Sequence, residues 1–376
     1  MSTAYTANAA CATGTGLPHA PSGAVSAWFQ LAGARWSWAC RVLAPDPGRV
    51  IPRTAADGPR AGDLALVEVD QLGSHERITL RENLRLRIYP GDRIVAVFGN
   101  RYATDAYEGE VRDIGDLSLL TAGGMIGTVR SRHRSMGRPT SVKFLGYVAD
   151  ASGHVVNLKE RAFRHAEPVS APRNLVAMVG TGMNAGKTTS CVRLIKSLTQ
   201  QGLRVAACKL TGSVSNRDQD EMRAASAVRV LDFSDYGFPS TYLCSEKELL
   251  ELFDTLLADL EPAGADVTVM EIADGILQRE TAMLLESVTV RSRLSGAVLA
   301  ADNALSARYA LNRLEELGHK VLAITGLLTS SPLCVRELGQ ICQTTVASSA
   351  GDATSLGTAV ASALGLFPAV SGQPAA

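Results

Sequence analysis

The pattern of apolar and polar positions along this chain changes near residue 165. Before that point, short runs dominated by apolar residues are separated by turn residues, such as those at 150–153. Such runs predict short β-strands, because glycine, proline, asparagine and aspartate favour reversals of the chain. The clearest runs are residues 63–69, 92–98, 141–148 and 155–158. Strands at this close spacing predict a β-rich domain, a barrel or a sandwich, over residues 24–165.

Beyond residue 173 the pattern alternates between apolar runs and helical periodicity. The apolar runs are residues 175–179, 204–209, 228–233, 267–272, 296–301 and 320–324. The segments with helical spacing are residues 187–201, 246–260, 304–317 and 353–364. This alternation predicts an α/β domain over residues 174–368, with a parallel sheet and helices on both of its faces. The composition of the remaining segments predicts a linker at 166–173 and disordered tails at 1–23 and 369–376.

A glycine-rich segment lies between the strand at 175–179 and the helix at 187–201. This context predicts a phosphate-binding loop, because glycines let backbone N–H groups turn toward an anion and the helix start adds partial positive charge. Lys187 would reach the terminal phosphates of a nucleotide, and the Thr188 hydroxyl would bind Mg²⁺. A glycine-rich turn that binds nothing is the alternative. The residues expected at the nucleotide are Gly180, Thr181, Gly182, Met183, Asn184, Ala185, Gly186, Lys187, Thr188 and Thr189.

Charged residues end two other strands, at the sheet edge where ligands of parallel sheets bind. Lys209 ends the second strand, where it would neutralise a phosphoryl group in transfer or hold a substrate carboxylate. Glu271 and Asp274 come at the end of the strand at 267–272, where such folds hold Mg²⁺ directly or through water. A solvated lysine and a structural carboxylate–arginine pair are the alternatives.

Several further polar residues have two open interpretations. Asp218 and Asp220 would either complete a Mg²⁺ shell or cap a helix, and Asn303 would either contact the base or substrate or cap a helix. The polar and aromatic segment 100–105 in the first domain marks a domain interface or a substrate loop. The histidines, His75 among them, are dispersed without ligand spacing, and we assign them no role.

Composition restricts the kinds of partner that we expect this chain to bind. The chain has 376 residues, enough for two or three domains, and its 37 basic and 37 acidic residues give no net charge. A general nucleic-acid binder carries a basic excess, so we expect no nucleic-acid partner. No run is long and apolar enough for a membrane, and residues 1–16 lack a secretory signal pattern, so we expect a cytoplasmic protein. The seven cysteines include no Cys-x-x-Cys pair, which argues against a cysteine metal site.

The loop from Gly180 to Thr188, together with Lys209 and Glu271, resembles the dethiobiotin synthetase group of P-loop enzymes. The loop of that group has the form Gly-Thr-x-x-x-x-Gly-Lys-Thr, a lysine ends its second strand, and a glutamate after a later strand binds Mg²⁺. The resemblance covers roughly residues 174–364. It implies ATP and Mg²⁺ as cofactors, ATP-dependent activation of a carboxyl group, and a homodimer. A more distant resemblance is to P-loop proteins that are similar to D-glutamate N-acetyltransferases.

Three functions follow as hypotheses. The first is an ATP- and Mg²⁺-dependent ligase or kinase that acts on a small carboxylate or amine, with Lys187 and Lys209 as catalytic residues. The second is a nucleotide-dependent switch or assembly factor, in which the P-loop domain controls what the β-rich domain binds. The third is an acyltransferase whose loop holds the phosphates of coenzyme A. The sequence of the first domain by itself implies no activity.

Overall fold

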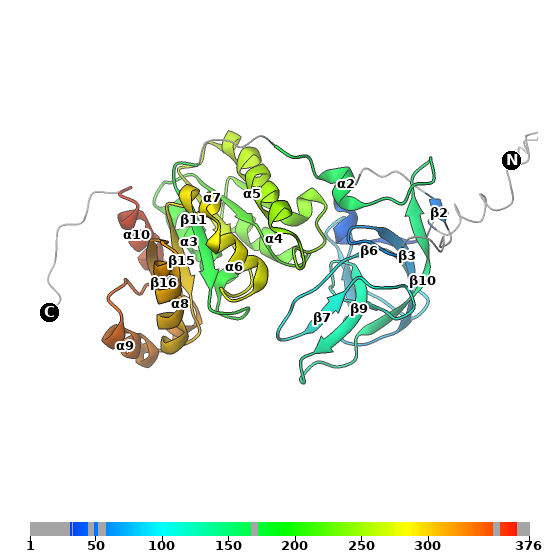
Figure 1. The fold of residues 1–376 in the computed structure, drawn as a ribbon, viewed down its shortest axis with the longest axis horizontal. Helices are drawn as coiled ribbons and strands as arrows, with labels where there is room; N and C mark the ends of the chain where they lie inside the picture. Colours follow the sequence, from blue (N-terminus) through cyan, green and yellow to red (C-terminus); the bar gives the residue numbers. More distant parts are fainter. Residues whose placement is uncertain are drawn as a thin grey trace, which may run out of the picture.

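A computed structural model describes residues 31, 33–43, 49–51, 58–166, 172–348 and 354–366. The predicted tails at 1–23 and 369–376, and residues 167–171 of the predicted linker, lie outside this part of the chain. The described residues form two domains that lie side by side (Figure 1). The structure confirms a β-rich first domain and a second domain with a parallel sheet flanked by helices.

The first domain is built around a closed β-barrel. Its strands are β1 (Arg35–Trp36), β2 (Arg49–Ile51), β3 (Leu64–Gln71), β6 (Arg93–Phe98), β7 (Tyr107–Glu110), β8 (Leu117–Leu119), β9 (Met125–Arg132) and β10 (Thr140–Ala149). They pair in the order β1-β6-β3-β10-β8-β9-β7, with β2 on β10. A parallel pairing joins β6 and β9, the second strand from each end of the path, so β6, β3, β10, β8 and β9 close into a ring. Closure leaves those strands no free edge, which identifies the barrel among the two predicted architectures.

The barrel carries smaller elements on its surface. They are a ribbon of β4 (Arg77–Thr79) and β5 (Arg85–Arg87), the 3-10 helix η1 (Trp38–Val42) and the helix α2 (Leu158–Ala162). Alternate residues of β3 and β6 divide between two apolar clusters, as the period of a strand requires. The cluster with Leu64 and Val95 also takes in Trp38, Leu158 and Val214, the last from the second domain. The barrel core is therefore continuous with the interface between the domains.

Residues 155–158 form no strand, so that prediction was wrong. Val155 makes a single bridge to the end of β10, and the chain then turns into α2. The turn is set by Asn157, whose side chain accepts hydrogen bonds from the backbone N–H groups of Lys159 (3.1 Å) and Glu160 (3.4 Å). A side chain that caps a helix start competes with the strand ladder for the same backbone donors.

The second domain is a three-layer α/β unit. Its six parallel strands are β11 (Leu175–Gly180), β12 (Val205–Lys209), β13 (Arg229–Asp232), β14 (Val267–Glu271), β15 (Gly296–Ala300) and β16 (Val321–Thr325), in the order β13-β12-β14-β11-β15-β16. One face is covered by α5 (Glu246–Leu260), α6 (Arg279–Glu286), α7 (Val288–Arg293), α8 (Ala304–Glu316) and α9 (Pro332–Ile341). The other is covered by α3 (Lys187–Gln200), α4 (Arg217–Ala224) and α10 (Thr354–Ala363). The 3-10 helices η2 (Phe233–Tyr236), η3 (Glu261–Ala263) and η4 (Leu327–Ser330) lie in the connections.

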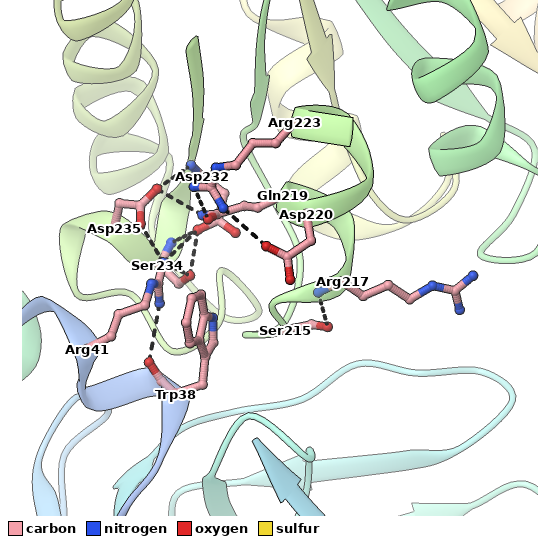
Figure 2. Close-up of polar contacts among 10 residues, drawn as sticks. All are labelled: Trp38, Arg41, Ser215, Arg217, Gln219, Asp220, Arg223, Asp232, Ser234 and Asp235. Carbon is pink, nitrogen blue, oxygen red and sulfur yellow. Dashed lines mark hydrogen bonds and ion pairs between the residues drawn. The ribbon is translucent and has the colours of Figure 1, made fainter. Parts of the chain in front are cut away.

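An ion-pair network joins the two domains (Figure 2). Arg41 of η1 donates to the Ser234 hydroxyl (2.9 Å) and pairs with the carboxylates of Asp235 (2.5 Å) and Asp232 (3.6 Å). Its guanidinium also lies over the Trp38 ring, 4.4 Å from the ring centroid. The side chain of Arg41 is 11% exposed, so water and salt screen these pairs weakly. The network therefore ties the barrel to η2 of the second domain.

Candidate nucleotide-binding site

The strand–loop–helix unit has the geometry that a phosphate-binding loop requires. The strand β11 ends at Gly180, and α3 begins at Lys187 after Gly186, whose φ of +93° is a left-handed value that favours glycine. A Cβ at Gly180 would lie 2.9 Å from Cγ of Lys187, so the glycine lets the lysine stem cross the strand end. Among the described residues no side chain caps α3, which leaves its first N–H groups for an anion. Thr189 lies exposed on that first turn.

Lys187 folds back into the loop. It is 3% exposed, and its Nζ donates to the carbonyl oxygen of Gly182 at 2.8 Å. Burial lowers the pKa of the Lys187 ammonium, and the carboxylates of Glu271 and Asp274 oppose that effect. The amine thus lies over the loop, where the phosphates of a nucleotide would meet it.

Glu271 is the centre of the site. The hydroxyl of Thr188 donates to its Oε1 at 3.0 Å, and Nζ of Lys209 lies 3.3 Å from the same oxygen. The strand order explains this meeting, because β14 lies between β11 and β12 and pairs Glu271 directly with Lys209. Glu271 is 1% exposed, and its Oε2 has no hydrogen-bond partner within the described ranges. A buried carboxylate oxygen without a partner is costly and requires a cation or water in the working protein.

Lys209 links this centre to α4. Its Nζ pairs with Asp218 as well as with Glu271, and its side chain is 12% exposed. Burial lowers the pKa of Lys209, but Glu271 and Asp218 outweigh burial, and the net pKa is raised. Lys209 is therefore a held cation, and Asp218, a predicted Mg²⁺ ligand, is bound to it in this structure.

The oxygen ligands around Glu271 suit Mg²⁺, which keeps waters and substrate phosphates in its shell, better than they suit a metal ion that is bound only by protein side chains. In the part of the chain that the structure covers, no three His, Cys, Asp or Glu side chains come together in a metal-binding group. Mg²⁺ is usually held by one or two protein oxygens together with waters and substrate phosphates. The Thr188 hydroxyl and the unpartnered oxygen of Glu271 form such a set beside the loop. The residues present therefore fit the ion.

Two of the other candidate residues make structural contacts. Asp220 accepts hydrogen bonds from the side-chain amides of Asn83 in the barrel and Asn216, both at 3.0 Å. Asn303 caps α8, because its Oδ1 accepts from the N–H of Ser306 at 3.0 Å. These contacts match the capping interpretation for Asn303 and place Asp220 at the domain interface. Their predicted roles toward a nucleotide or metal stay predictions.

Both domains hold the phosphate-binding loop. On the barrel side, Asn184 donates to Asp105 at 3.0 Å, and the Thr104 hydroxyl lies 4.0 Å from Sδ of Met183. The segment 100–105 therefore lies at a domain interface, one of its two predicted roles.

Within its own domain, the hydroxyl of Thr181 donates to Asp302 at 3.0 Å. The carbonyl oxygen of Ala185 accepts from the N–H of Leu327 at 3.0 Å. The sequence analysis missed Asp302, although its position directly after a strand could have indicated it.

A cavity of about 270 Å³ lies between the domains beside this site. The second domain contributes Lys209, Asp274 and Met183 to its wall, and the barrel contributes Arg101 and His75. Segment 100–105 therefore also lines a cavity, which its interpretation as a substrate loop requires. The sequence analysis assigned His75 no role, because nothing local to it indicates that the barrel brings it to Arg101.

The described helices include none that is both long and apolar enough to cross a membrane. No family model matches this chain, and no curated protein matches it. Several solved structures resemble part of this chain. They include the signal recognition particle receptor FtsY from Elizabethkingia anophelis in complex with GDP, with 16% identity, 55% of this chain and 69% of that chain covered, and a TM-score of 0.34.

Two further structures have similar values. One is the signal recognition particle 54 kDa protein from Aeropyrum pernix K1, with 17% identity and a TM-score of 0.32. The match covers 53% of this chain and 41% of that chain. The other is the kinase domain of the Escherichia coli tyrosine kinase ETK, with 15% identity and a TM-score of 0.31. The match covers 40% of this chain and 66% of that chain. Likenesses this distant say nothing of function. The P-loop NTPase fold of the second domain rests on its own loop, helix and parallel sheet.

Proposed function

We propose that this chain is an ATP- and Mg²⁺-dependent enzyme that activates or phosphorylates a small carboxylate or amine metabolite. One observation carries the proposal. Lys187, Thr188, Lys209 and Glu271 converge at the strand ends, and a cavity that both domains line opens at the same place. A phosphate-binding loop beside a cavity for an acceptor is what transfer of a phosphoryl group to a small molecule needs.

Each residue has a role that its position supports. The loop N–H groups and Lys187 would bind the β- and γ-phosphates, and Thr188 with Glu271 would hold Mg²⁺. Bound Mg-ATP supplies the phosphoryl group and the divalent charge. Lys209 lies between Glu271 and the cavity, so its ammonium would stabilise negative charge on the side that faces the acceptor. These roles support a place in the dethiobiotin synthetase-like group of ligases and kinases.

A specific observation favours the nucleotide-dependent switch as the second candidate. In the first turn of α4, Asp218 pairs with Lys209, and the next residue, Gln219, donates to Asp235 at 2.9 Å. Asp235 in turn pairs with Arg41 of the barrel (Figure 2). Three consecutive ion-pair and hydrogen-bond contacts therefore connect the nucleotide site to the first domain. Such a connection would transmit nucleotide state to the surface of the barrel.

Phosphorus NMR of the full chain with Mg-ATP and pooled amines, amino acids and carboxylic acids tests the proposal. We expect metabolite-dependent release of ADP and phosphate, or a new phosphorus signal. Lys187→Ala should abolish that turnover. Lys196→Ala, which removes an exposed lysine from the same helix, should leave turnover unchanged. Full turnover in the Lys187 variant would overturn the proposal, and Mg-ATP that stays intact with every pool would favour the switch.

Two further properties are proposals by resemblance and composition. We propose that the chain acts as a homodimer, as its resemblance to the dethiobiotin synthetase group implies, and that it works in the cytoplasm with no nucleic-acid partner. Light scattering on the purified chain at micromolar concentration measures the first, and a monomer at every concentration would contradict it.

A further inference from the structure

The cavity between the domains has the size of a site for a small metabolite. Its volume of about 270 Å³ is several times the roughly 30 Å³ share of one water molecule. It is smaller than the roughly 300–1,000 Å³ of sites that enclose drug-sized ligands. One wall comes from the barrel and the other from the strand ends of the P-loop domain. A molecule inside it would touch both domains at once.

The barrel wall presents a positively charged group that is held in place but unpaired. The backbone of Arg101 is fixed by two hydrogen bonds with Gly109, at 2.8 and 3.0 Å, and its guanidinium donates to the carbonyl oxygen of Leu120. No carboxylate of the described residues lies within 4 Å of this guanidinium. Burial lowers the pKa of Arg101, and Asp105, Tyr107 and Asp274 oppose that effect. A guanidinium has five N–H donors in a planar fork, so most of its donors remain for a ligand.

The opposite wall presents an unpaired carboxylate. Asp274 is partly buried, and throughout the described ranges it has neither a hydrogen bond nor an ion pair. Burial raises the pKa of Asp274, while Lys187 and Lys209 lower it. Asp274 and Arg101 line the same cavity, and no ion pair joins them among the described residues. One unpaired cation and one unpaired anion therefore line a single cavity.

A third unsatisfied group lies on the barrel side. Nδ1 of His75 is buried and has no hydrogen-bond partner among the residues that the structure covers. Burial, followed by the charges of Arg101 and Arg85, lowers the pKa of His75 to about 4, so the imidazole is neutral at neutral pH. His75 lines the cavity, and its neutral imidazole brings no third charge to the wall.

We propose that this cavity binds a small zwitterion, an amino-acid-like molecule whose carboxylate pairs with Arg101 and whose ammonium group pairs with Asp274. A zwitterion brings no net charge into a half-buried space and satisfies both unpaired groups. A simple carboxylate would leave Asp274 unpaired, and a simple amine would leave Arg101 unpaired, each at a cost. The barrel domain thereby selects the acceptor. The role of this ligand as acceptor rests on the proposed ATP-dependent function, whereas its binding does not.

Calorimetric titration of the full chain tests the binding. The probes are the proteinogenic amino acids in both enantiomers, and for each that binds, the matched acid without its amine and the matched amine without its carboxylate. We expect at least one zwitterion to bind ten times more tightly than either matched molecule. Loss of the charged fork in Arg101→Ala should weaken it about tenfold to a hundredfold. Arg134→Ala, at an exposed arginine of the barrel, should change nothing.

Two further variants keep the result decisive. Arg101→Lys preserves the charge without the fork and should also weaken binding, which covers the case in which Arg101→Ala does not fold. In Asp274→Asn, the matched acid should bind as tightly as the zwitterion, because the partner of the ammonium group is gone. Equal affinity of the wild-type chain for a zwitterion and its matched acid, or binding of no amino acid by folded protein, would overturn the inference. Zwitterion binding by a chain that does not use Mg-ATP would support the cavity and refute the enzyme.

Discussion

Replacement of Lys209 by methionine is the sharpest test of the site as described. Methionine keeps an unbranched stem of similar length but removes the ammonium, so Glu271 and Asp218 lose their shared cation. The side chain of Glu271 is 2% exposed and that of Lys209 is 12% exposed, so the variant leaves an uncompensated charge out of water. Removal of one partner from a buried ion pair costs about 3–5 kcal/mol. We expect a loss of that size in the free energy of unfolding.

Urea unfolding followed by far-UV circular dichroism measures this loss, because the helices lie mainly in the second domain. Lys143→Met is the matched control, since Lys143 pairs with Asp70 at 2.6 Å on the surface and its side chain is 63% exposed. We expect the control to unfold like the wild type. The double variant Lys209→Met/Glu271→Gln should recover part of the loss, because it removes the buried charge as well.

The sign of the pKa shift gives a second, independent check. The pKa of Lys209 is raised, so its pairing stabilises the fold at every pH below the ordinary lysine value of about 10.4 and is lost only above it. The difference between wild type and Lys209→Met should therefore be the same at pH 7 and pH 9. A loss below about 1 kcal/mol at pH 7, the range of exposed pairs, would refute the buried pairing.

Three further predictions concern the barrel and the interface. The pKa of His75 is lowered to about 4, so the fold loses stability as the pH falls from about 6.5 toward 4. In urea unfolding, His75→Gln should lose about 2 kcal/mol less free energy of unfolding than the wild type between pH 7 and pH 5. Arg41→Ala leaves Asp235 without its cation, so it should destabilise the protein by about 3 kcal/mol in the same assay. It should also separate the two domains in limited proteolysis, and a digest identical to that of the wild type would contradict this. Gly237→Ala should unfold at a lower temperature than Gly264→Ala, since both have positive φ but only a Cβ at Gly237 would lie 2.2 Å from a carbonyl oxygen of α2.

Much of the second domain was predictable because its signals are local. The strand β11, the loop and α3 follow one another in the chain, and Gly186 marks the turn between them. Lys209 and Glu271 could be assigned to strand ends because apolar runs stop at them. The helices α4, α6, α7 and α9 were not predicted. Each has ten residues or fewer, which is shorter than the window of about 11–18 residues in which helical spacing is recognised.

The sequence by itself determined that a phosphate-binding loop opens a parallel sheet and that short strands precede it, because both depend on neighbouring residues. Tertiary structure alone decided that β14 lies between β12 and β11, which brings Glu271 to Thr188 and Lys209. It also decided that β9 closes on β6 to make a barrel, and that this barrel carries Arg101 to the cavity beside Lys209. Pairings of this kind join segments that are far apart in the chain. They depend on strand order and on the packing of the two domains, and no local pattern of apolar and polar residues encodes either of these.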